Sequence, residues 1–166
     1  MRKAELERLQ NQQTDHNLTP AMIQRLKDEL ARLESTDRPR AIEEMQRNAE
    51  DGDFSENAGY QDAKRRLRRI NSRILTLTER IARAVPIEEG VDATGAIRIG
   101  STVTLELADG TKSTYQIVGS QEVDIARGRI SHTSPLGSTL LDRYAGDDVV
   151  VLTNNGEVTY RVLKVE

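Results

Sequence analysis

The most regular apolar pattern lies in the middle of the chain. Apolar residues recur there at alternating spacings of three and four, at Tyr60, Ala63, Leu67, Ile70, Ile74, Leu77, Ile81 and Ala84. A seam of this kind, sustained over more than three heptads, is typical of a coiled-coil helix. The pattern therefore predicts a long helix that packs mainly against one other helix.

The preceding stretch is expected to be that other helix. Thr19 and Pro20 form a helix start, with a capping residue followed by proline at the first position. Three-and-four spacing follows, breaks around Asp37-Arg38-Pro39 with Pro39 in the first turn of the next segment, and then resumes. Because glycine tolerates the positive φ of a reversal, Asp51-Gly52-Asp53 predicts the turn of an antiparallel hairpin. The second arm, from about Phe54 to Val85, has 32 residues and extends roughly 45–50 Å.

The last part of the chain has a different periodicity. Alternating apolar and polar residues flank Ala108-Asp109-Gly110 and again Asn154-Asn155-Gly156, which predicts two β-hairpins. A short helix is expected within 135–144. We therefore predict an α+β protein with a coiled-coil hairpin over residues 1–86, a linker over 87–96 and a mostly antiparallel domain over 97–166. Residues 1–17 are either a helical extension or a tail.

Composition excludes several kinds of site. The chain contains no cysteine and two histidines, which rules out thiolate chemistry and disfavours a histidine metal site. One Phe and four Tyr are too few to line an aromatic pocket. No apolar run approaches the ~20 residues that span a bilayer. The charged first residues do not resemble a secretory signal. We expect a cytoplasmic protein without membrane contact.

The turn of the predicted hairpin carries two acids, Asp53 and Glu56, three residues apart. Such carboxylates can share a Mg²⁺ ion, whose remaining ligands would come from another molecule. Acids at an exposed turn are also commonly a solvated surface or favour the helix dipole. A calcium loop fits poorly, because its sixth position should be glycine and its twelfth glutamate, and these are Glu56 and Asp62.

A basic run follows the acids. Its members lie off the apolar seam and are expected to be exposed, where they could contact RNA phosphate or a partner protein. Such a run also often forms a solvated face that pairs with acids of the neighbouring helix. The candidate contact residues are Lys64, Arg65, Arg66, Arg68, Arg69 and Arg73.

The segment "GDFSENAGYQDAKRRLRRINSRI", followed by "STVTLELADG", "TYQIVG" and "ISHTSPLGSTLLDRYAGDDVVVLT", resembles the bacterial GreA/GreB transcript cleavage factors over about residues 18–166. The basic run is more similar to the GreB branch. The resemblance implies an FKBP-like C-terminal domain that docks on RNA polymerase and a coiled coil that enters its secondary channel. It implies a monomer that stimulates the polymerase's own cleavage of backtracked RNA and is not itself an enzyme.

By the same resemblance, Asp53 and Glu56 would act in trans in the polymerase active site and hold a Mg²⁺ ion shared with the polymerase, with none bound by the free protein. Asn57 and Tyr60 would support the tip. A loop at Thr133, Ser134 and Pro135 would contact the polymerase rim.

The sequence departs from the family pattern at Gly59, where an acid is usual, and in its residues before Leu18. A channel-binding inhibitor of RNA polymerase that does not stimulate cleavage therefore stays open. A prolyl isomerase is suggested only by fold analogy, which does not establish activity. A plain coiled-coil interaction module is the remaining alternative.

Overall fold

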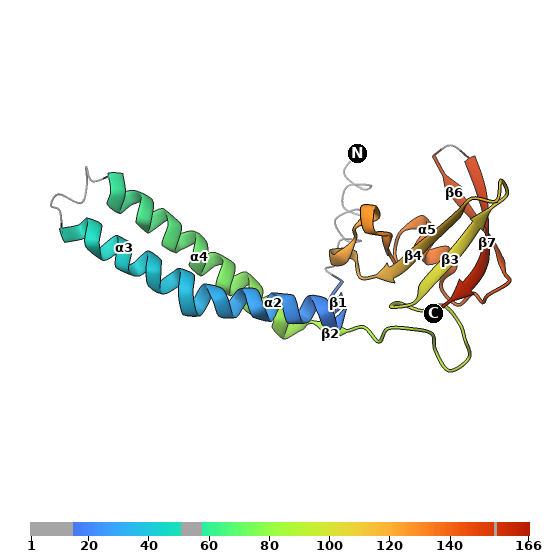
Figure 1. The fold of residues 1–166 in the computed structure, drawn as a ribbon, viewed down its shortest axis with the longest axis horizontal. Coiled ribbons are helices and arrows are strands. Elements are labelled where there is room, and N and C mark those ends of the chain that lie inside the picture. Colours follow the sequence, from blue (N-terminus) through green and yellow to red (C-terminus); the bar gives the residue numbers. More distant parts are fainter. Residues whose placement is uncertain (1–14, 51–57, 155) are drawn as a thin grey trace, which may run out of the picture. The chain divides into compact units, whose positions relative to one another are not determined.

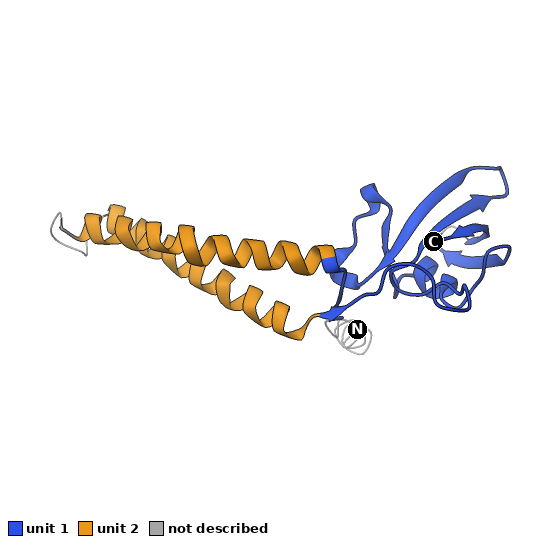
Figure 2. Ribbon diagram, turned by 60° about the horizontal axis from the view of Figure 1, so that its bottom comes forward, with its two compact units in different colours: residues 1–20, 85–166 blue, residues 21–84 orange. Residues whose placement is uncertain are grey.

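The computed structural model describes residues 15–50, 58–154 and 156–166. The chain divides into two compact units (Figure 2). The first, here the hairpin unit, comprises Ala21–Ala84. The second, here the sheet unit, comprises Met1–Pro20 together with Val85–Glu166. Within the described residues, none of the helices is both long and apolar enough to cross a membrane.

In its described residues, the hairpin unit contains helices α2, α3 and α4 (Figure 1). Helix α2 (Pro20–Arg32) continues through a π-helical turn, Leu33–Asp37, into α3 (Arg38–Glu50), and α4 (Ala58–Arg83) runs back along them. Buried apolar residues lie on both arms, Leu26, Leu33 and Ala41 on one and Ala63 and Leu77 on the other. The remaining seam residues of α4 are partly buried. The predicted seam is thus the packing face of α4.

The helix was expected to break near Pro39, and instead it continues through a π-helical turn. The backbone stays helical, with Arg32 at φ −62°, ψ −44° and Arg38 at φ −66°, ψ −49°. The Arg38 N–H donates to the Leu33 carbonyl, five residues back, which is the hydrogen bond of a π turn. Pro39 cannot donate to the carbonyl four residues earlier and its ring crowds that carbonyl. A widened turn accommodates the proline, which lies in the first turn of α3 as predicted.

The sheet unit contains a five-stranded sheet in the order β5-β4-β3-β7-β6. Both predicted β-hairpins are present, and their strands pair antiparallel. Strand β5 pairs parallel with β4, so the sheet is mixed. The strands are β3 (Thr102–Leu107), β4 (Lys112–Val118), β5 (Arg129–Ser131), β6 (Asp148–Thr153) and β7 (Gly156–Val165).

Short elements complete the sheet unit. Helix α5 (Pro135–Leu140) is the short helix expected within 135–144, and it ends before Asp142, which takes a positive φ of 62°. Two 3-10 turns, Ser120–Glu122 and Ile125–Arg127, lie between β4 and β5. Strands β1 (Asn17–Leu18) and β2 (Val85–Pro86) pair parallel.

One apolar core holds the sheet unit together. Its buried side chains come from β3, β4, β5, β6, β7, α5 and the segment before β3: Ile97, Val103, Leu105, Ile117, Ile130, Leu140, Val149 and Val162. Burying each such side chain contributes about 1.5–3 kcal/mol. The core fixes α5 against the sheet and thereby positions the loop that precedes α5.

Candidate functional site

The predicted acidic tip falls mostly outside the described residues. Asp53, Glu56 and Asn57 belong to residues 51–57, for which the structure gives no account. The helix ends on either side are described: α3 ends at Glu50 and α4 begins at Ala58. Figure 1 shows these two ends side by side at one end of the hairpin unit. The segment that carries the acids therefore connects the two arms at that end.

Tyr60 and Lys64 form a contact in the first turns of α4. The Lys64 Nζ lies 5.8 Å from the centroid of the Tyr60 ring, within the range of a cation–π interaction. Both residues are partly buried, so Lys64 is less exposed than its place off the seam predicts. The pair lies in the first two turns of α4, next to the predicted tip.

Three of the basic residues are held by carboxylates. Arg65 Nη2 lies 2.6 Å from Asp62 Oδ1, and Arg66 Nη1 lies 2.7 Å from Glu44 Oε2. Arg73 binds Glu29 with both Nε and Nη2, at 2.8 and 2.9 Å. Arg66 and Arg73 thus pair with acids of the neighbouring arm, as the solvated-face interpretation of the run predicts.

These ion pairs shift the pKa values of the groups that form them. The hydrogen bond from Arg65 is the main reason that the pKa of Asp62 is lowered, although Asp62 is exposed. The hydrogen bond from Arg73 likewise lowers the pKa of Glu29, and the same bond raises the pKa of Arg73. The charges of the three arginines are thus partly compensated, by an acid of α4 for Arg65 and by acids of the other arm for Arg66 and Arg73.

Arg68 and Arg69 differ from these three arginines in having no carboxylate partner among the described residues. Both side chains are exposed, and in the described part of the chain neither forms an ion pair. They lie one turn beyond Lys64 and Arg65 on α4. Of the six predicted contact residues, these two retain full charge toward solvent and are the best placed to attract a phosphate backbone.

Hydrogen bonds of Ser131 and Ser134 hold the predicted rim loop, Thr133 to Pro135. Ser134 caps α5 by accepting a hydrogen bond from the Gly137 N–H at 3.0 Å, and its hydroxyl donates to the Ser131 carbonyl at 2.7 Å. Pro135 occupies the first turn of α5 and is exposed, as is Thr133. A Cβ on Gly137 would collide with the Ser131 carbonyl oxygen. The loop thus presents Thr133 and Pro135 from a fixed backbone.

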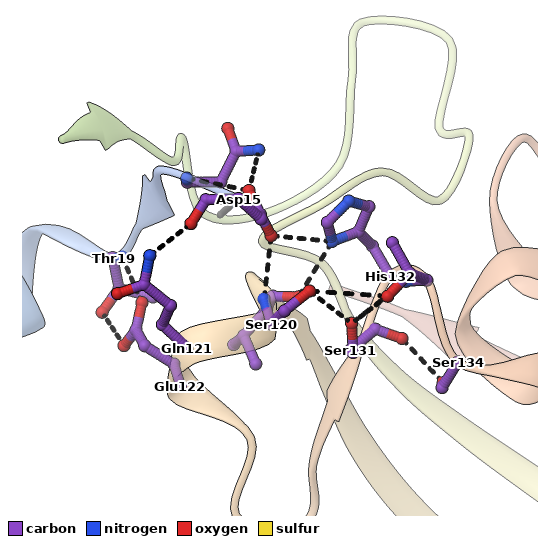
Figure 3. A network of polar contacts seen from close by, with 11 residues as sticks. Asp15, Thr19, Ser120, Gln121, Glu122, Ser131, His132 and Ser134 are labelled. Carbon is purple, nitrogen blue, oxygen red and sulfur yellow. Dashed lines mark hydrogen bonds and ion pairs between the residues drawn. The ribbon is translucent and has the colours of Figure 1, made fainter. Parts of the chain in front are cut away.

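A polar network next to this loop was not expected from the sequence (Figure 3). Asp15 Oδ2 accepts a hydrogen bond from the Ser120 N–H at 2.8 Å and lies 3.3 Å from His132 Nδ1. Asp15 Oδ1 accepts from the Asn17 backbone N–H at 2.9 Å. Burial acts to raise the pKa of Asp15, but these backbone hydrogen bonds outweigh it and the pKa is lowered. The His132 ring is partly buried against this carboxylate.

The same network holds a buried acid. The Glu122 side chain is fully buried and accepts from the Thr19 N–H at 2.5 Å and from the Thr19 hydroxyl at 2.7 Å. Arg129 Nη1 lies 3.7 Å from Glu122 Oε1 and supplies a positive charge. Thr19 directly precedes α2, so this contact fixes the residue from which that helix starts. No local sequence signal marks Glu122, because its partner Thr19 is 103 positions away.

Metal-binding groups do not gather elsewhere: within residues 15–50, 58–154 and 156–166, no three His, Cys, Asp or Glu side chains are placed to hold an ion. The predicted Mg²⁺ ligands, Asp53 and Glu56, lie outside those ranges. Their carboxylate oxygens are of the type that Mg²⁺ prefers.

Comparison with known proteins matches both parts of the chain. Residues 16–85 match the family model "Transcription elongation factor, N-terminal", and residues 92–166 match "Transcription elongation factor, GreA/GreB, C-term". The chain is 40% identical to transcription elongation factor GreB of Neisseria meningitidis serogroup A over 93% of this chain and 95% of that protein.

It is 41% identical to transcription elongation factor GreA of Anaeromyxobacter sp. over 89% of this chain and 90% of the relative. Among solved structures, GreA factor homolog 1 (Gfh1) of Thermus thermophilus is 30% identical, with a TM-score of 0.40 over 92% of this chain and 99% of that one. Relatives named GreB and GreA match at similar identity, so the comparisons leave the predicted GreB character a prediction.

Proposed function

Because the chain belongs to the GreA/GreB family of transcription elongation factors, we propose that it stimulates RNA polymerase to hydrolyse backtracked RNA. Factors of this family are accessory proteins of RNA polymerase and not enzymes themselves. On this proposal the free protein carries part of a site, and the polymerase supplies the rest.

The observation that supports the proposal most is the arrangement of the hairpin unit around residues 51–57. Both arms end there, at Glu50 and Ala58. Helix α4 alone has 26 residues, so it extends about 39 Å. A narrow two-helix arm of this length can reach a site inside a partner that a compact domain could not enter.

Asp53 and Glu56 supply the chemistry in the proposal. Their carboxylates would complete the shell of a Mg²⁺ ion held jointly with the polymerase. Such an ion makes its bound water more acidic and stabilises charge on the phosphodiester oxygens. Asp53 and Glu56 would contribute the negative charge that this chain brings to the ion. The contact between Tyr60 and Lys64 would order the first turns of α4, which follow these acids.

Two other surfaces would act in binding. Arg68 and Arg69, exposed and without ion pairs to described residues, would attract the phosphates of extruded RNA. Thr133 and Pro135 would contact the polymerase from the loop that Ser134 and Gly137 hold in place. The first surface lies in the hairpin unit and the second in the sheet unit.

The test is to add the purified protein to stalled, backtracked elongation complexes and to follow RNA length. Shortened RNA that can be extended again is the expected result. Reduced initiation without any shortening would instead identify a channel-binding inhibitor.

A further inference from the structure

A cavity of about 560 Å³ lies in the hairpin unit, at the end away from Glu50 and Ala58. Figure 2 shows α2 and α4 separating toward this end. We name this cavity the arginine groove. Its polar lining consists of Arg25, Asp28, Glu29 and Arg32 from α2, with Arg73 and Arg80 from α4.

The four arginines are regularly placed. Arg25 and Arg32 are seven residues apart on α2, and Arg73 and Arg80 are seven apart on α4. Seven residues are nearly two full turns, so the members of each pair share one face of their helix and lie about 10 Å apart along it. The groove therefore has two guanidinium groups on each wall.

The positive charge of the groove is not balanced by its acids. Glu29 binds Arg73, and Arg32 Nε lies 3.5 Å from Asp37 Oδ2. Within the described residues Arg25 and Arg80 form no ion pair, and the buried Nε of Arg80 has no hydrogen-bond partner.

The Nε itself has almost no accessible surface, so an anion in the groove would be bound by the other guanidinium nitrogens of Arg80 and by the exposed Arg25 and Arg32. Guanidinium groups bind phosphate oxygens through paired, charge-assisted hydrogen bonds. A chain of linked phosphates offers more negative charges and oxygens than a single phosphate and can contact guanidinium groups on both walls of the groove. We propose that the arginine groove binds a short polyphosphate chain, either inorganic or as the triphosphate of a nucleotide.

Glu29 would act as an internal competitor. Its carboxylate holds both Nε and Nη2 of Arg73, the two donors that a phosphate would use. Replacing Glu29 by glutamine removes a negative charge from the groove and releases Arg73. The change is therefore expected to tighten polyphosphate binding, in contrast to the arginine substitutions.

The test is calorimetric titration of the full chain with inorganic tripolyphosphate in low salt. One saturable site is expected. Arg25→Gln and Arg80→Gln should each weaken it about tenfold, and Glu29→Gln should tighten it several-fold. Arg47→Gln and Glu43→Gln make the same charge changes outside the groove and should alter affinity less than twofold. Circular dichroism checks folding, and Arg25, being exposed, keeps the test valid if the Arg80 variant unfolds.

Separate arms identify the source of the phosphates. ATP should bind about as tightly as tripolyphosphate, and an oligoribonucleotide with a 5′-hydroxyl much more weakly. Absence of saturable binding, or equal weakening by Arg47→Gln, would overturn the proposal. Preferential binding of the oligoribonucleotide would also overturn it and would make the groove a nucleic-acid surface. No polymerase is present, so failure here would leave the proposed function standing.

Discussion

Arg73 of α4 clasps Glu29 of α2 with two parallel hydrogen bonds, of 2.8 Å from Nε to Oε1 and 2.9 Å from Nη2 to Oε2. The two residues are 44 positions apart in the chain. Their side chains remain 45% and 31% exposed, so solvent screens the attraction. The contact joins the two arms of the hairpin at a defined register.

A double-mutant cycle measures this contact. For Glu29→Gln and Arg73→Gln we expect a coupling free energy of about 0.5–1 kcal/mol, because the geometry is bidentate but the pair is partly solvated. Urea unfolding of the four proteins gives the value, and raising the salt concentration should reduce it. A coupling indistinguishable from zero at low salt would show that the pair does not hold the register.

Asp15 should make stability depend on pH. Its pKa is lowered in the folded protein, so its stabilising effect is complete above the unfolded pKa of about 3.9 and is lost as pH falls through the folded pKa. Asp15→Asn should reduce the free energy of unfolding by about 1–2 kcal/mol near neutral pH. The difference from the original protein should shrink in strongly acidic solution.

Unfolding curves at several pH values test this expectation. Asp148→Asn, at an exposed position on β6, is the matched control and should leave stability nearly unchanged throughout. A deficit in Asp15→Asn that stayed the same at acidic pH would mean that packing, and not the charge, accounts for the effect.

Helix α5 should not tolerate a single added methyl group at Gly137. Gly137→Ala places a Cβ against the Ser131 carbonyl oxygen, a backbone atom that cannot move freely. We expect a loss of about 1–3 kcal/mol in unfolding free energy. Ser138→Ala, in the same helix and exposed, should cost less than about 0.5 kcal/mol. Equal stability of the two variants would contradict the tight approach.

The basic run should divide into two groups in a cleavage assay. Arg68→Gln or Arg69→Gln should reduce the stimulation of RNA cleavage several-fold, because these side chains have no carboxylate partner within the described residues. Arg65→Gln removes the same charge but disrupts only an exposed pair with Asp62, so its effect should be small. Equal effects of all three would indicate a general attraction by the positive face.

Much of the fold follows from local patterns. The three-and-four seam predicts α4, and the Asp109-Gly110 and Asn155-Gly156 turns predict the two β-hairpins, because each signal lies within a few residues of the structure that it specifies. The π turn at Leu33–Asp37 replaces the expected break, since a proline can be accommodated without leaving the helical path.

The polar contacts of the sheet unit cannot be predicted from local sequence patterns. Asp15 and Ser120 are 105 positions apart, and Thr19 and Glu122 are 103 apart. The polar residues near Asp15 give no indication that the carboxylate is buried, and Glu122 resembles an ordinary surface acid in the sequence. Such partners are brought together only by the tertiary fold.

The central claim is that Asp53 and Glu56 act in the polymerase active site. Its most direct measurement is RNA cleavage in backtracked complexes with Asp53→Asn and Glu56→Gln, alongside polymerase affinity. We expect each variant to lose more than tenfold in cleavage stimulation while affinity changes less than twofold, because each removes a charge that the proposal assigns to metal binding. Full cleavage stimulation by both variants would contradict the account.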